Sequence, residues 1–498
     1  MSAALTAEDW KTKRDGLSYR NQAFIDGKFV DSLSGDTFEC ISPLDGKVLT
    51  SIASCNEADV ELAVTAARQS FESGVWSRID PVKRKKTLLR LADLINKHAD
   101  ELALLETLDM GKPVGFSKTV DVAGTADCFA WYAEAIDKLY DEIAPTAANQ
   151  LAMIRREPMG VVAAITPWNF PMLMSSWKLA PALAMGNSVI LKPAKLSSLT
   201  ALRIAELGSE AGLPDGVLNV ITGSGGLVGK ALGVHMDVDS VVFTGSTAVG
   251  KTIMGYAAES NLKPVALECG GKSPHIVFAD ANLKRAARAV CTGAFFNQGE
   301  QCSSGTRLLI EESVRDEFVA MVIAEAKKIT PGDPLNPDSF MGAMVDEGQT
   351  NTVMNYISIG KEGGAELLLG GNQVMQETGG YYIEPTIFGN VTNDMRIAQE
   401  EIFGPVLSTI SFTDAEDAIR IANDSIYGLA SGVWTQDITK AHSVSGAIRA
   451  GTVWVNCYDA VAITTPFGGY KQSGFGRDRS LHALDKYTQI KTLWMKVG

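Results

Sequence analysis

Residues 161–165 read Val-Val-Ala-Ala-Ile, a fully apolar run that ends just before Pro167. A helix-like stretch follows it, and then comes a second apolar run, Ser188-Val-Ile-Leu191. The alternation continues with a helical pattern over 199–211 and with strand-like runs at 217–221 and 240–243. Short apolar strands that alternate with helices are typical of a parallel sheet covered on both faces. The sequence therefore predicts an α/β fold.

The same alternation recurs beyond Gly270-Gly271, with a strand at 275–278, a helix up to Ala294 and a strand at 307–310. Two α/β units are therefore expected, with a border near this glycine pair. The part before residue 160 is different. It predicts a hairpin over Ala23–Val30 and helices over 57–71, 81–108 and 123–140.

Composition narrows the class of protein. The chain has 498 residues, enough for more than one domain, and a formal charge of −13, which disfavours nonspecific binding to nucleic acid. The basic run Lys83–Lys86 lies in a helical pattern and is expected to be solvated. Seven cysteines without a C-x-x-C pair suggest neither disulfides nor a metal site. The polar N-terminus and the lack of a long apolar run favour a cytoplasmic protein without membrane contact.

Cys302 is the first candidate for chemistry. It lies in Phe295-Phe-Asn-Gln-Gly-Glu-Gln-Cys302-Ser-Ser-Gly-Thr-Arg307, between a helix and a strand. A lone cysteine is more often a small buried apolar residue. Here the polar setting and the flanking Gly299 and Gly305 favour an accessible nucleophilic thiol.

Two further positions have polar side chains at the ends of apolar runs. Glu268 follows Val265-Ala-Leu267, where partial desolvation raises a carboxyl pKa and suits it to general-base catalysis. Asn169 lies between Pro167 and Pro171, where its amide can donate to an oxyanion. Each has an ordinary alternative, a solvated glutamate near a turn and a turn asparagine, respectively.

Glycine-rich turns follow two of the predicted strands. Phe243-Thr-Gly245-Ser246 leads into a helix, where backbone N–H groups can hold a pyrophosphate. The turn that contains Gly225 and Gly229 resembles the G-x-G-x-x-G fingerprint only loosely. Lys192 ends the 188–191 strand, at the edge where open α/β sheets bind ligands.

Taken together, these motifs resemble the NAD(P)-dependent aldehyde dehydrogenase superfamily over nearly the whole chain, from about Phe24 to Trp494. Leu267–Pro274 matches the glutamate signature of the family, and Phe295–Arg307 matches its cysteine signature. Other matches follow in the expected order: Pro167–Phe170, Lys192-Pro193, Phe243–Gly250, Glu400–Pro405 and Pro466–Lys471.

The resemblance implies the role of each matching residue. Cys302 attacks the aldehyde, and Asn169 together with the Cys302 N–H holds the oxyanion of the thiohemiacetal. Hydride transfer to the nicotinamide leaves a thioester, which water activated by Glu268 hydrolyses to the acid. The implied cofactor contacts are Ile165, Trp168, Lys192, Lys195, Gly225, Gly229, Phe243, Gly245, Ser246, Glu268, Glu401 and Phe403. No metal is implied.

Lys195 departs from many NAD-preferring relatives, which have a glutamate at this position. The missing carboxylate removes an acceptor for the ribose 2′-OH and a repulsion against a 2′-phosphate. NAD is the expected cofactor, and NADP becomes an alternative. Glu300, where glutamine is frequent, and Ser304, where alanine or glycine is common, are interpreted as variation.

The resemblance also implies a substrate pocket that is mostly apolar or aromatic, suited to a medium-sized chain or ring. Asp459 within it either attracts an amine or has a structural role. The expected lining residues are Phe170, Met174, Trp177, Gln301, Ser303, Trp454, Asp459, Val461 and Phe467.

Among relatives, the chain resembles most the bacterial enzymes that act on γ-aminobutyraldehyde, γ-glutamyl-γ-aminobutyraldehyde or guanidinobutyraldehyde. An ω-amino, γ-glutamylamino or guanidino alkyl aldehyde is therefore expected. An arylacetaldehyde such as indole-3-acetaldehyde is an alternative, because aromatic residues of the pocket can stack a ring. A broad-range aldehyde dehydrogenase is another.

The fold implied by the family has three parts. A Rossmann-like parallel-sheet cofactor domain comprises 1–139 and 159–270, and a second α/β catalytic domain comprises 271–470. A small β hairpin at 140–158 and the segment 471–498 are expected to mediate assembly into a homodimer or homotetramer. The alternative is that these strands close within one chain.

Two rival functions remain open. A CoA-acylating relative would transfer the acyl group to CoA, but such relatives generally lack the glutamate found at 268. A non-enzymatic structural protein is disfavoured by the intact Cys302, Glu268 and Asn169.

Overall fold

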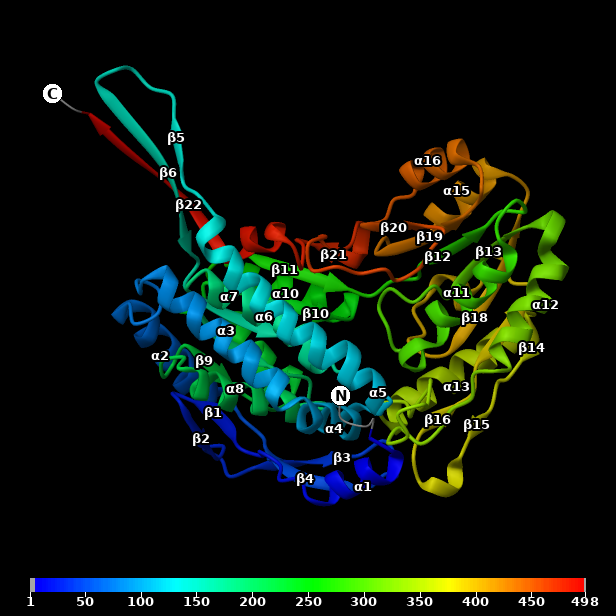
Figure 1. Ribbon diagram of the computed structural model, residues 1–498, viewed down its shortest axis with the longest axis horizontal. Coiled ribbons are helices and arrows are strands. Elements are labelled where there is room, and N and C mark those ends of the chain that lie inside the picture. Colours follow the sequence, from blue (N-terminus) through cyan, green and yellow to red (C-terminus); the bar gives the residue numbers. More distant parts are fainter. Residues whose placement is uncertain (1–4, 497–498) are drawn as a thin grey trace.

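The structure, a computed structural model, describes residues 5–496 and contains two large sheets with helices around them (Figure 1). In strand order, the first sheet consists of β2 (Lys28–Val30), β1 (Ala23–Ile25), β9 (Leu218–Val220), β8 (Ser188–Lys192), β7 (Val161–Ile165), β10 (Ser240–Gly245), β11 (Val265–Cys269) and β21 (Gly474–Phe475). The five strands from β9 to β11 are parallel. The prediction of a parallel α/β sheet is confirmed.

Burial of both faces of strand β7 explains why its residues are all apolar. Val161, Ala163 and Ile165 belong to the hydrophobic core on one side of the sheet. Val162 and Ala164 belong to the core on the other side. Successive side chains of a strand point to opposite faces, so a strand with helices on both faces has no solvent-facing position.

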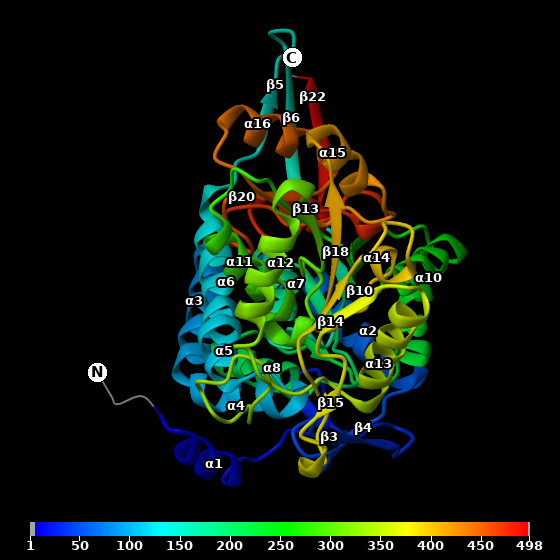
Figure 2. The ribbon, with the colours of Figure 1, turned by 90° about the vertical axis from the view of Figure 1, so that its right-hand side faces the viewer.

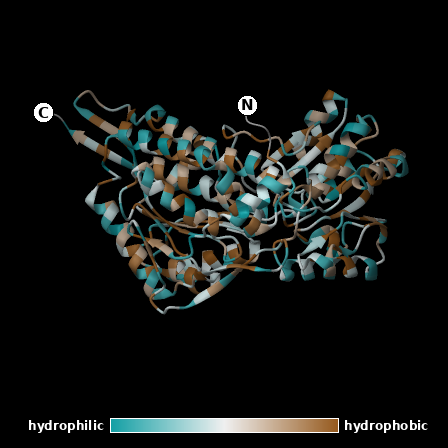
Figure 3. Cartoon of the chain, turned by 60° about the horizontal axis from the view of Figure 1, so that its bottom comes forward, coloured by the Kyte–Doolittle hydropathy of each residue, from teal (hydrophilic) through white to brown (hydrophobic). Residues whose placement is uncertain are grey.

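Helices form a layer on each face of this sheet. One core contains residues of α3 (Pro81–Lys97), α4 (Ala99–Met110), α6 (Ala123–Ala135), α7 (Pro171–Ala184) and α8 (Leu199–Ala211). The other contains residues of α2 (Glu57–Ser73), α9 (Lys230–Val234) and α10 (Thr247–Glu259). Along many helices hydrophobic and hydrophilic bands alternate (Figure 3), as expected when one side of a helix packs on a sheet.

The second sheet is also mostly parallel, with β14 antiparallel to its neighbour at one edge. Its strand order is β14 (Glu366–Leu369), β17 (Thr386–Gly389), β18 (Val406–Phe412), β13 (Arg307–Glu311), β12 (Pro274–Val277), β19 (Ala430–Trp434) and β20 (Thr452–Val455). The helices associated with it are α11 (Leu283–Phe295), α12 (Arg315–Ala326), α13 (Glu347–Glu362), α14 (Arg396–Gln399), α15 (Ala415–Asn423) and α16 (Ile438–Ala447). The chain passes from the first sheet to the second at Gly270-Gly271, between β11 and β12.

A three-stranded antiparallel sheet projects away from the body of the protein (Figures 1 and 2). It consists of β22 (Thr488–Lys496), β6 (Gln150–Pro158) and β5 (Glu142–Ala144). Strand β6 pairs with β22 of the same chain along nine residue pairs. The segment before β22 does not belong to this small sheet, because β21 pairs with β11 in the first sheet. The remaining elements are α1 (Ala7–Asp15), β3 (Thr37–Ile41), β4 (Val48–Ala53), α5 (Val114–Phe116), β15 (Gln373–Val374) and β16 (Tyr382–Ile383).

Several predicted boundaries were wrong. The single helix expected over 81–108 is two helices, α3 and α4, because His98 leaves the helical conformation (ψ 22°). Helix α4 buries every residue from Leu102 to Met110, so tertiary packing rather than an amphipathic stripe sets its direction. The helix expected over 123–140 ends at Ala135 and continues only as a turn to Lys138. Within the part of the chain that the structure describes, no helix is long and apolar enough to cross a membrane.

Candidate active site

Cys302 lies in the loop between α11 and β13. Three consecutive residues of this loop, Asn297, Gln298 and Gly299, have left-handed backbone conformations with φ of 49°, 57° and 73°. A Cβ atom on Gly299 would lie 2.3 Å from the carbonyl oxygen of Gly404, so only glycine fits there. This turn reverses the chain after α11 and leads it back to Cys302.

The Cys302 thiol is half-buried, like that of Cys457, whereas the other five cysteines are buried. Burial raises the pKa of Cys302 well above its usual range, and the nearby carboxylates of Glu268, Glu401 and Asp459 raise it further. The thiol therefore needs a group that accepts its proton before it can act as a nucleophile. Among residues 5–496, no carbonyl accepts a hydrogen bond from the Cys302 N–H.

Asn169 lies in the turn between β7 and α7 and is almost completely buried. Its Nδ2 donates a hydrogen bond to the carbonyl oxygen of Glu300 at 2.9 Å. In return, its own carbonyl accepts one from Asn297 Nδ2 at 3.1 Å. These two bonds join the Asn169 turn to the loop of Cys302. One of the two Nδ2 hydrogens and the Cys302 N–H are left to donate to an oxyanion.

Glu268 lies near the end of β11 and is 4% exposed, and its Oε1 has no hydrogen-bond partner among the described residues. Burial and the nearby Asp478 carboxylate raise its pKa to about 8, against the opposing effect of Lys178, Lys486 and Arg477. The Gly270-Gly271 pair after this strand approaches Cys302 closely, since a Cβ on Gly271 would lie 2.8 Å from the Cys302 carbonyl oxygen. Glu268 therefore lies beside the thiol as a carboxyl group that exchanges its proton near neutral pH.

The strand order of the first sheet reverses at β7. From β7 the chain continues to β8 and β9 on one side, and then to β10 and β11 on the other side of β7. Ligands of open α/β sheets bind where the order reverses in this way, at the carboxyl ends of the strands. Ile165 ends β7, Phe243 and Gly245 lie at the end of β10, and Ser246 caps the N-terminus of α10. These predicted cofactor residues meet at the reversal point.

Four other predicted cofactor residues end or follow the neighbouring strands β8 and β9. Lys192 ends β8, is buried and donates to the carbonyl of Pro193, and burial lowers its pKa to about 8. Lys195 is exposed, with its ammonium 5.0 Å from the Phe38 ring centre. Gly225 and Gly229 bound a short helical turn after β9, and a Cβ on either would meet nothing within 4 Å.

Two predicted cofactor residues come from the second sheet's part of the chain. Glu401 Oε1 accepts a hydrogen bond from the Gly271 N–H at 3.0 Å, and burial raises the pKa of its carboxyl to about 7. Phe403 meets Trp168 edge-on, with ring centres 5.1 Å apart. These contacts bring the Glu401–Phe403 segment to both Trp168 and the Glu268 strand.

The predicted substrate residues are grouped, with one exception. The rings of Trp177 and Phe467 lie 5.6 Å apart, and those of Phe170 and Phe296 lie 6.3 Å apart. Phe170, Met174, Gln301, Ser303, Trp454 and Phe467 are all buried. Val461, by contrast, is 63% exposed. Asp459 accepts a hydrogen bond from Gln301, and a longer one from Ser303 at 3.5 Å, so its carboxylate holds both neighbours of Cys302.

Some groups around the site were missed in the sequence. Asp478 forms ion pairs with Lys178 and Lys486 next to Glu268. The ammonium of Lys112 pairs with Asp121 at 2.8 Å and lies 3.7 Å from the centre of the Phe170 ring. Lys178 could have been found from the sequence, because a lone charged residue in the apolar helix α7 indicates a buried ion pair. Lys112, in Gly111-Lys-Pro113 after the helix expected over 81–108, has no comparable signal in the sequence.

A cluster of aromatic rings next to the Cys302 loop was also missed. Tyr458 donates from its hydroxyl to the Ser303 carbonyl at 2.7 Å and stacks on His275 with ring centres 4.4 Å apart. Trp434 Nε1 donates to Nε2 of that histidine at 2.7 Å. Burial lowers the pKa of His275 to about 3, so the ring is neutral. Tyr458, His275 and Trp434, from three segments far apart in the chain, thus support the loop that contains Cys302.

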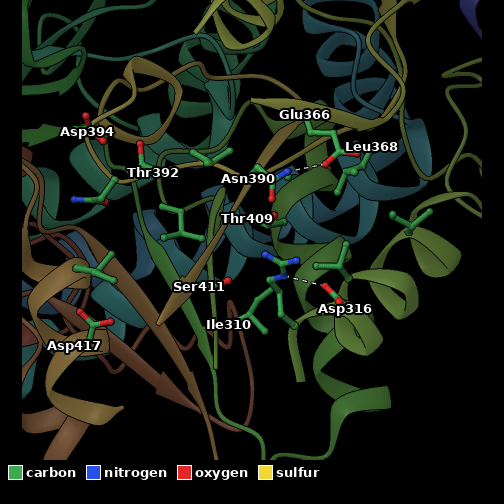
Figure 4. Close-up of a pocket in the computed structure, with 18 of the residues that line it drawn as sticks. Ile310, Asp316, Glu366, Leu368, Asn390, Thr392, Asp394, Thr409, Ser411 and Asp417 are labelled. Carbon is green, nitrogen blue, oxygen red and sulfur yellow. Dashed lines mark hydrogen bonds and ion pairs between the residues drawn. The ribbon is translucent and has the colours of Figure 1, made fainter. Parts of the chain in front are cut away.

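A pocket of about 880 Å³ lies elsewhere, beside α12 and α15 near the ends of β13 and β17 (Figure 4). None of the predicted site residues lines it. Its polar groups pair with each other, as Asn390 does with Glu366 at 2.8 Å and Arg315 with Asp316 at 2.9 Å. Nothing in it matches the chemistry around Cys302.

Comparisons with known proteins agree with this geometry. A sequence model described as "Aldehyde dehydrogenase family" matches residues 29–493. The NADP/NAD-dependent aldehyde dehydrogenase PuuC of Escherichia coli is 50% identical over 489 residues, which cover 98% of each chain. A structure of a mutant of the indole-3-acetaldehyde dehydrogenase AldA of P. syringae, in complex with NAD+ and IAA, is 57% identical, with a TM-score of 0.98 over 99% of this chain and 100% of that one. The γ-glutamyl-γ-aminobutyraldehyde dehydrogenase of Burkholderia cenocepacia is 54% identical, with the same TM-score and coverage.

Proposed function

The chain belongs to the aldehyde dehydrogenase family and is an enzyme of that family, and we propose that it oxidises an aldehyde to a carboxylic acid with Cys302, Glu268 and Asn169 as its catalytic residues. The observation that carries this proposal is the hydrogen bond from Asn169 to the carbonyl of Glu300, two residues before the nucleophile. This bond joins an amide donor to the loop of a half-buried thiol, and the buried carboxyl group of Glu268 lies near that thiol.

In the first half of the reaction, the Cys302 sulfur bonds to the aldehyde carbon and its proton passes to a base. The carbonyl oxygen becomes the alkoxide of a thiohemiacetal, held by the Cys302 N–H and Asn169 Nδ2. When bound, the nicotinamide supplies the hydride acceptor that turns this group into a thioester. Enclosure of Asn169 strengthens its hydrogen bond to the developing charge.

In the second half, Glu268 takes a proton from water, whose oxygen attacks the thioester carbon. The C–S bond breaks, the acid leaves and the thiol regains a proton. A carboxyl group with a pKa of about 8 is a stronger base than an ordinary glutamate and still ionises near neutral pH. We therefore assign water, not CoA, as the acyl acceptor.

For the cofactor we propose NAD, with NADP accepted. The residues fit a dinucleotide, because the Gly245-Ser246 turn offers the start of α10 to a pyrophosphate and Lys192 is buried without a carboxylate partner among the described residues. Glu401, next to the Gly270-Gly271 backbone, is suited to a ribose hydroxyl. Exposed Lys195 presents no carboxylate to repel a 2′-phosphate. The similarity to PuuC, named as NADP/NAD-dependent, supports use of both.

For the substrate we propose an ω-amino, γ-glutamylamino or guanidino alkyl aldehyde. The similarity to the γ-glutamyl-γ-aminobutyraldehyde dehydrogenase supports this class. The second candidate is an arylacetaldehyde such as indole-3-acetaldehyde, favoured by the Trp177–Phe467 pair and by the similarity to AldA. A broad-range activity would accept both classes.

We further propose the assembly and location of the enzyme. Segments 1–139 and 159–270 would bind the cofactor, 271–470 would carry the nucleophile, and 140–158 with 471–498 would join subunits into a homodimer or homotetramer. The projecting sheet supports this assembly, since Ile143, Ile490 and Trp494 are 73%, 65% and 62% exposed. Seven free thiols are suited to the reducing cytoplasm.

The test of the catalytic assignment uses two cysteine variants. Cys302→Ala should lower NAD(P)H formation by about 10³-fold or more, because no thioester can form. Cys457→Ala, which removes the other half-buried thiol, should retain activity. Persistent activity of Cys302→Ala would contradict the covalent mechanism. An aldehyde panel, run with NAD and NADP in parallel, then tests the substrate and cofactor proposals, and a clear preference for indole-3-acetaldehyde would overturn the first substrate choice.

A further inference from the structure

Arg479 is an unusual residue beside Trp177 and Phe467, two of the residues predicted to line the substrate pocket. The side chain is 4% exposed, yet no carboxylate of residues 5–496 lies within ion-pair distance of it and none of its nitrogens donates a hydrogen bond to them. Its Nε is fully buried and has no hydrogen-bond partner among the described residues. A buried guanidinium without a carboxylate partner is costly, and such residues are normally paired.

Two aromatic rings lie beside this guanidinium. Its central carbon lies 5.0 Å from the ring centre of Trp177 and 5.0 Å from that of Phe467. Both rings belong to the predicted lining of the substrate pocket. Stacking on aromatic faces fixes a planar guanidinium and leaves its N–H edges free to donate in a fork to a carboxylate.

The backbone at this position is constrained as well. Arg479 and Ser480 have left-handed conformations with φ of 59° and 51°, which non-glycine residues rarely adopt. Hydrogen bonds keep them there: Ser480 N–H donates to the Ile463 carbonyl at 2.7 Å, and the Tyr132 hydroxyl donates to the Ser480 carbonyl at 3.0 Å. Conformations of this kind persist where the surrounding structure enforces them, often next to bound ligands.

The one carboxylate among the predicted pocket residues is already engaged. Asp459 accepts from Gln301 and Ser303 beside the nucleophile. It lies close enough to Arg479 to influence it through space but forms no ion pair with it. The positive charge of Arg479 is therefore available to a ligand in the pocket.

We propose that Arg479 binds a carboxylate at the far end of the aldehyde substrate. This inference rests on the proposed aldehyde oxidation and selects among its substrate classes. An ω-amino or guanidino alkyl aldehyde ends in a cation, which Arg479 repels. A γ-glutamylamino aldehyde ends in an amino-acid group whose carboxylate matches the guanidinium. Arg479 is thus assigned as a specificity-determining residue for aldehydes with a carboxylate at the far end.

The test compares γ-glutamyl-γ-aminobutyraldehyde with its analogue in which the α-carboxylate is an amide. For the unaltered enzyme, kcat/KM should be about 10- to 100-fold higher with the carboxylate, the range expected for a partly buried charge-assisted pair. Arg479→Met should abolish this preference, whereas Arg479→Lys should retain part of it. Arg285→Met, which removes an exposed guanidinium 6.0 Å from the Trp434 ring, should leave it unchanged.

Activity on propanal, which has no distal charge, distinguishes a failure of this inference from a failure of the proposed function. If Arg479→Met loses activity to the same extent on propanal and on both larger aldehydes, that result would assign Arg479 a structural role and overturn the inference. Equal kcat/KM of the unaltered enzyme for the carboxylate and the amide would overturn it even if Arg479→Met does not fold. If the unaltered enzyme oxidises no aldehyde at all, propanal included, the proposed function itself fails.

Discussion

Gln301 donates a hydrogen bond from Nε2 to Oδ2 of Asp459 at 2.8 Å, which connects the residue before the nucleophile to a loop 158 positions further along the chain. Ser303, the residue after the nucleophile, reaches the other oxygen of the same carboxylate at 3.5 Å. Asp459 therefore holds both sides of Cys302 and is better described as a positioning residue than as a receptor for a substrate amine.

Removal of this carboxylate should impair turnover rather than substrate selection. In Asp459→Ala, Gln301 and Ser303 lose their acceptor, and a loss of about 1–2 kcal/mol of positioning corresponds to a kcat about tenfold lower. The decrease should be similar for propanal and for γ-aminobutyraldehyde. Asp485→Ala, which removes an exposed carboxylate, is the control. A higher KM for the aminoaldehyde alone would instead identify Asp459 as an amine-binding group.

The rate should depend on pH through Glu268. Only the carboxylate form accepts a proton from water, and the pKa of about 8 keeps the group mostly protonated below that pH. We expect kcat to rise between pH 6 and 9 with a midpoint near 8 when hydrolysis is rate-limiting. Glu268→Gln should lose this midpoint and give one rapid burst of NAD(P)H without turnover. A variant without the burst would indicate that Glu268 activates the thiol instead.

Glu300 should make the folded protein less stable as the pH rises. Its buried carboxyl has a pKa well above the usual value, so the folded state keeps a proton that the unfolded chain releases above pH about 4.5. Each pH unit between the two pKa values lowers the free energy of unfolding by about 1.4 kcal/mol.

Glu300→Gln removes this proton linkage and keeps an Oε1 acceptor for the Val345 N–H, which now donates at 3.0 Å. The variant should unfold at a higher temperature than the unaltered protein at pH 8, with a smaller difference at pH 5. Thermal denaturation at the two pH values measures this. An equal difference in unfolding temperature at both pH values would mean that Glu300 has the same pKa in the folded and unfolded states.

A negative charge at residue 195 should make the enzyme discriminate against NADP and in favour of NAD. Lys195→Glu places a carboxylate at an exposed position in the turn after β8, where it repels a 2′-phosphate. We expect kcat/KM for NADP to fall about tenfold or more, with the value for NAD unchanged or higher. Lys284→Glu, at an exposed position on α11, controls for the change in net charge. Equal effects on NAD and NADP would show that Lys195 does not approach the 2′ position.

Local sequence was sufficient for individual elements. The helix over Leu199–Ala211 and the strand over Val161–Ile165 have the predicted bounds. Apolar periodicity and glycine or proline at element ends act over a few residues, so they are visible without tertiary structure. Where packing replaces periodicity the prediction was wrong, as at His98, where one expected helix became α3 and α4.

The sequence by itself determined the fold class, the family and the chemistry expected at Cys302, because each depends on short motifs in a fixed order. Tertiary structure alone decided the strand order that reverses between β7 and β10, the attachment of Asp459 to the nucleophile's neighbours, and the unpaired burial of Arg479. Strand order and burial result from contacts between residues far apart in the chain, and a pKa such as that of Glu268 follows from that burial. No local pattern encodes them.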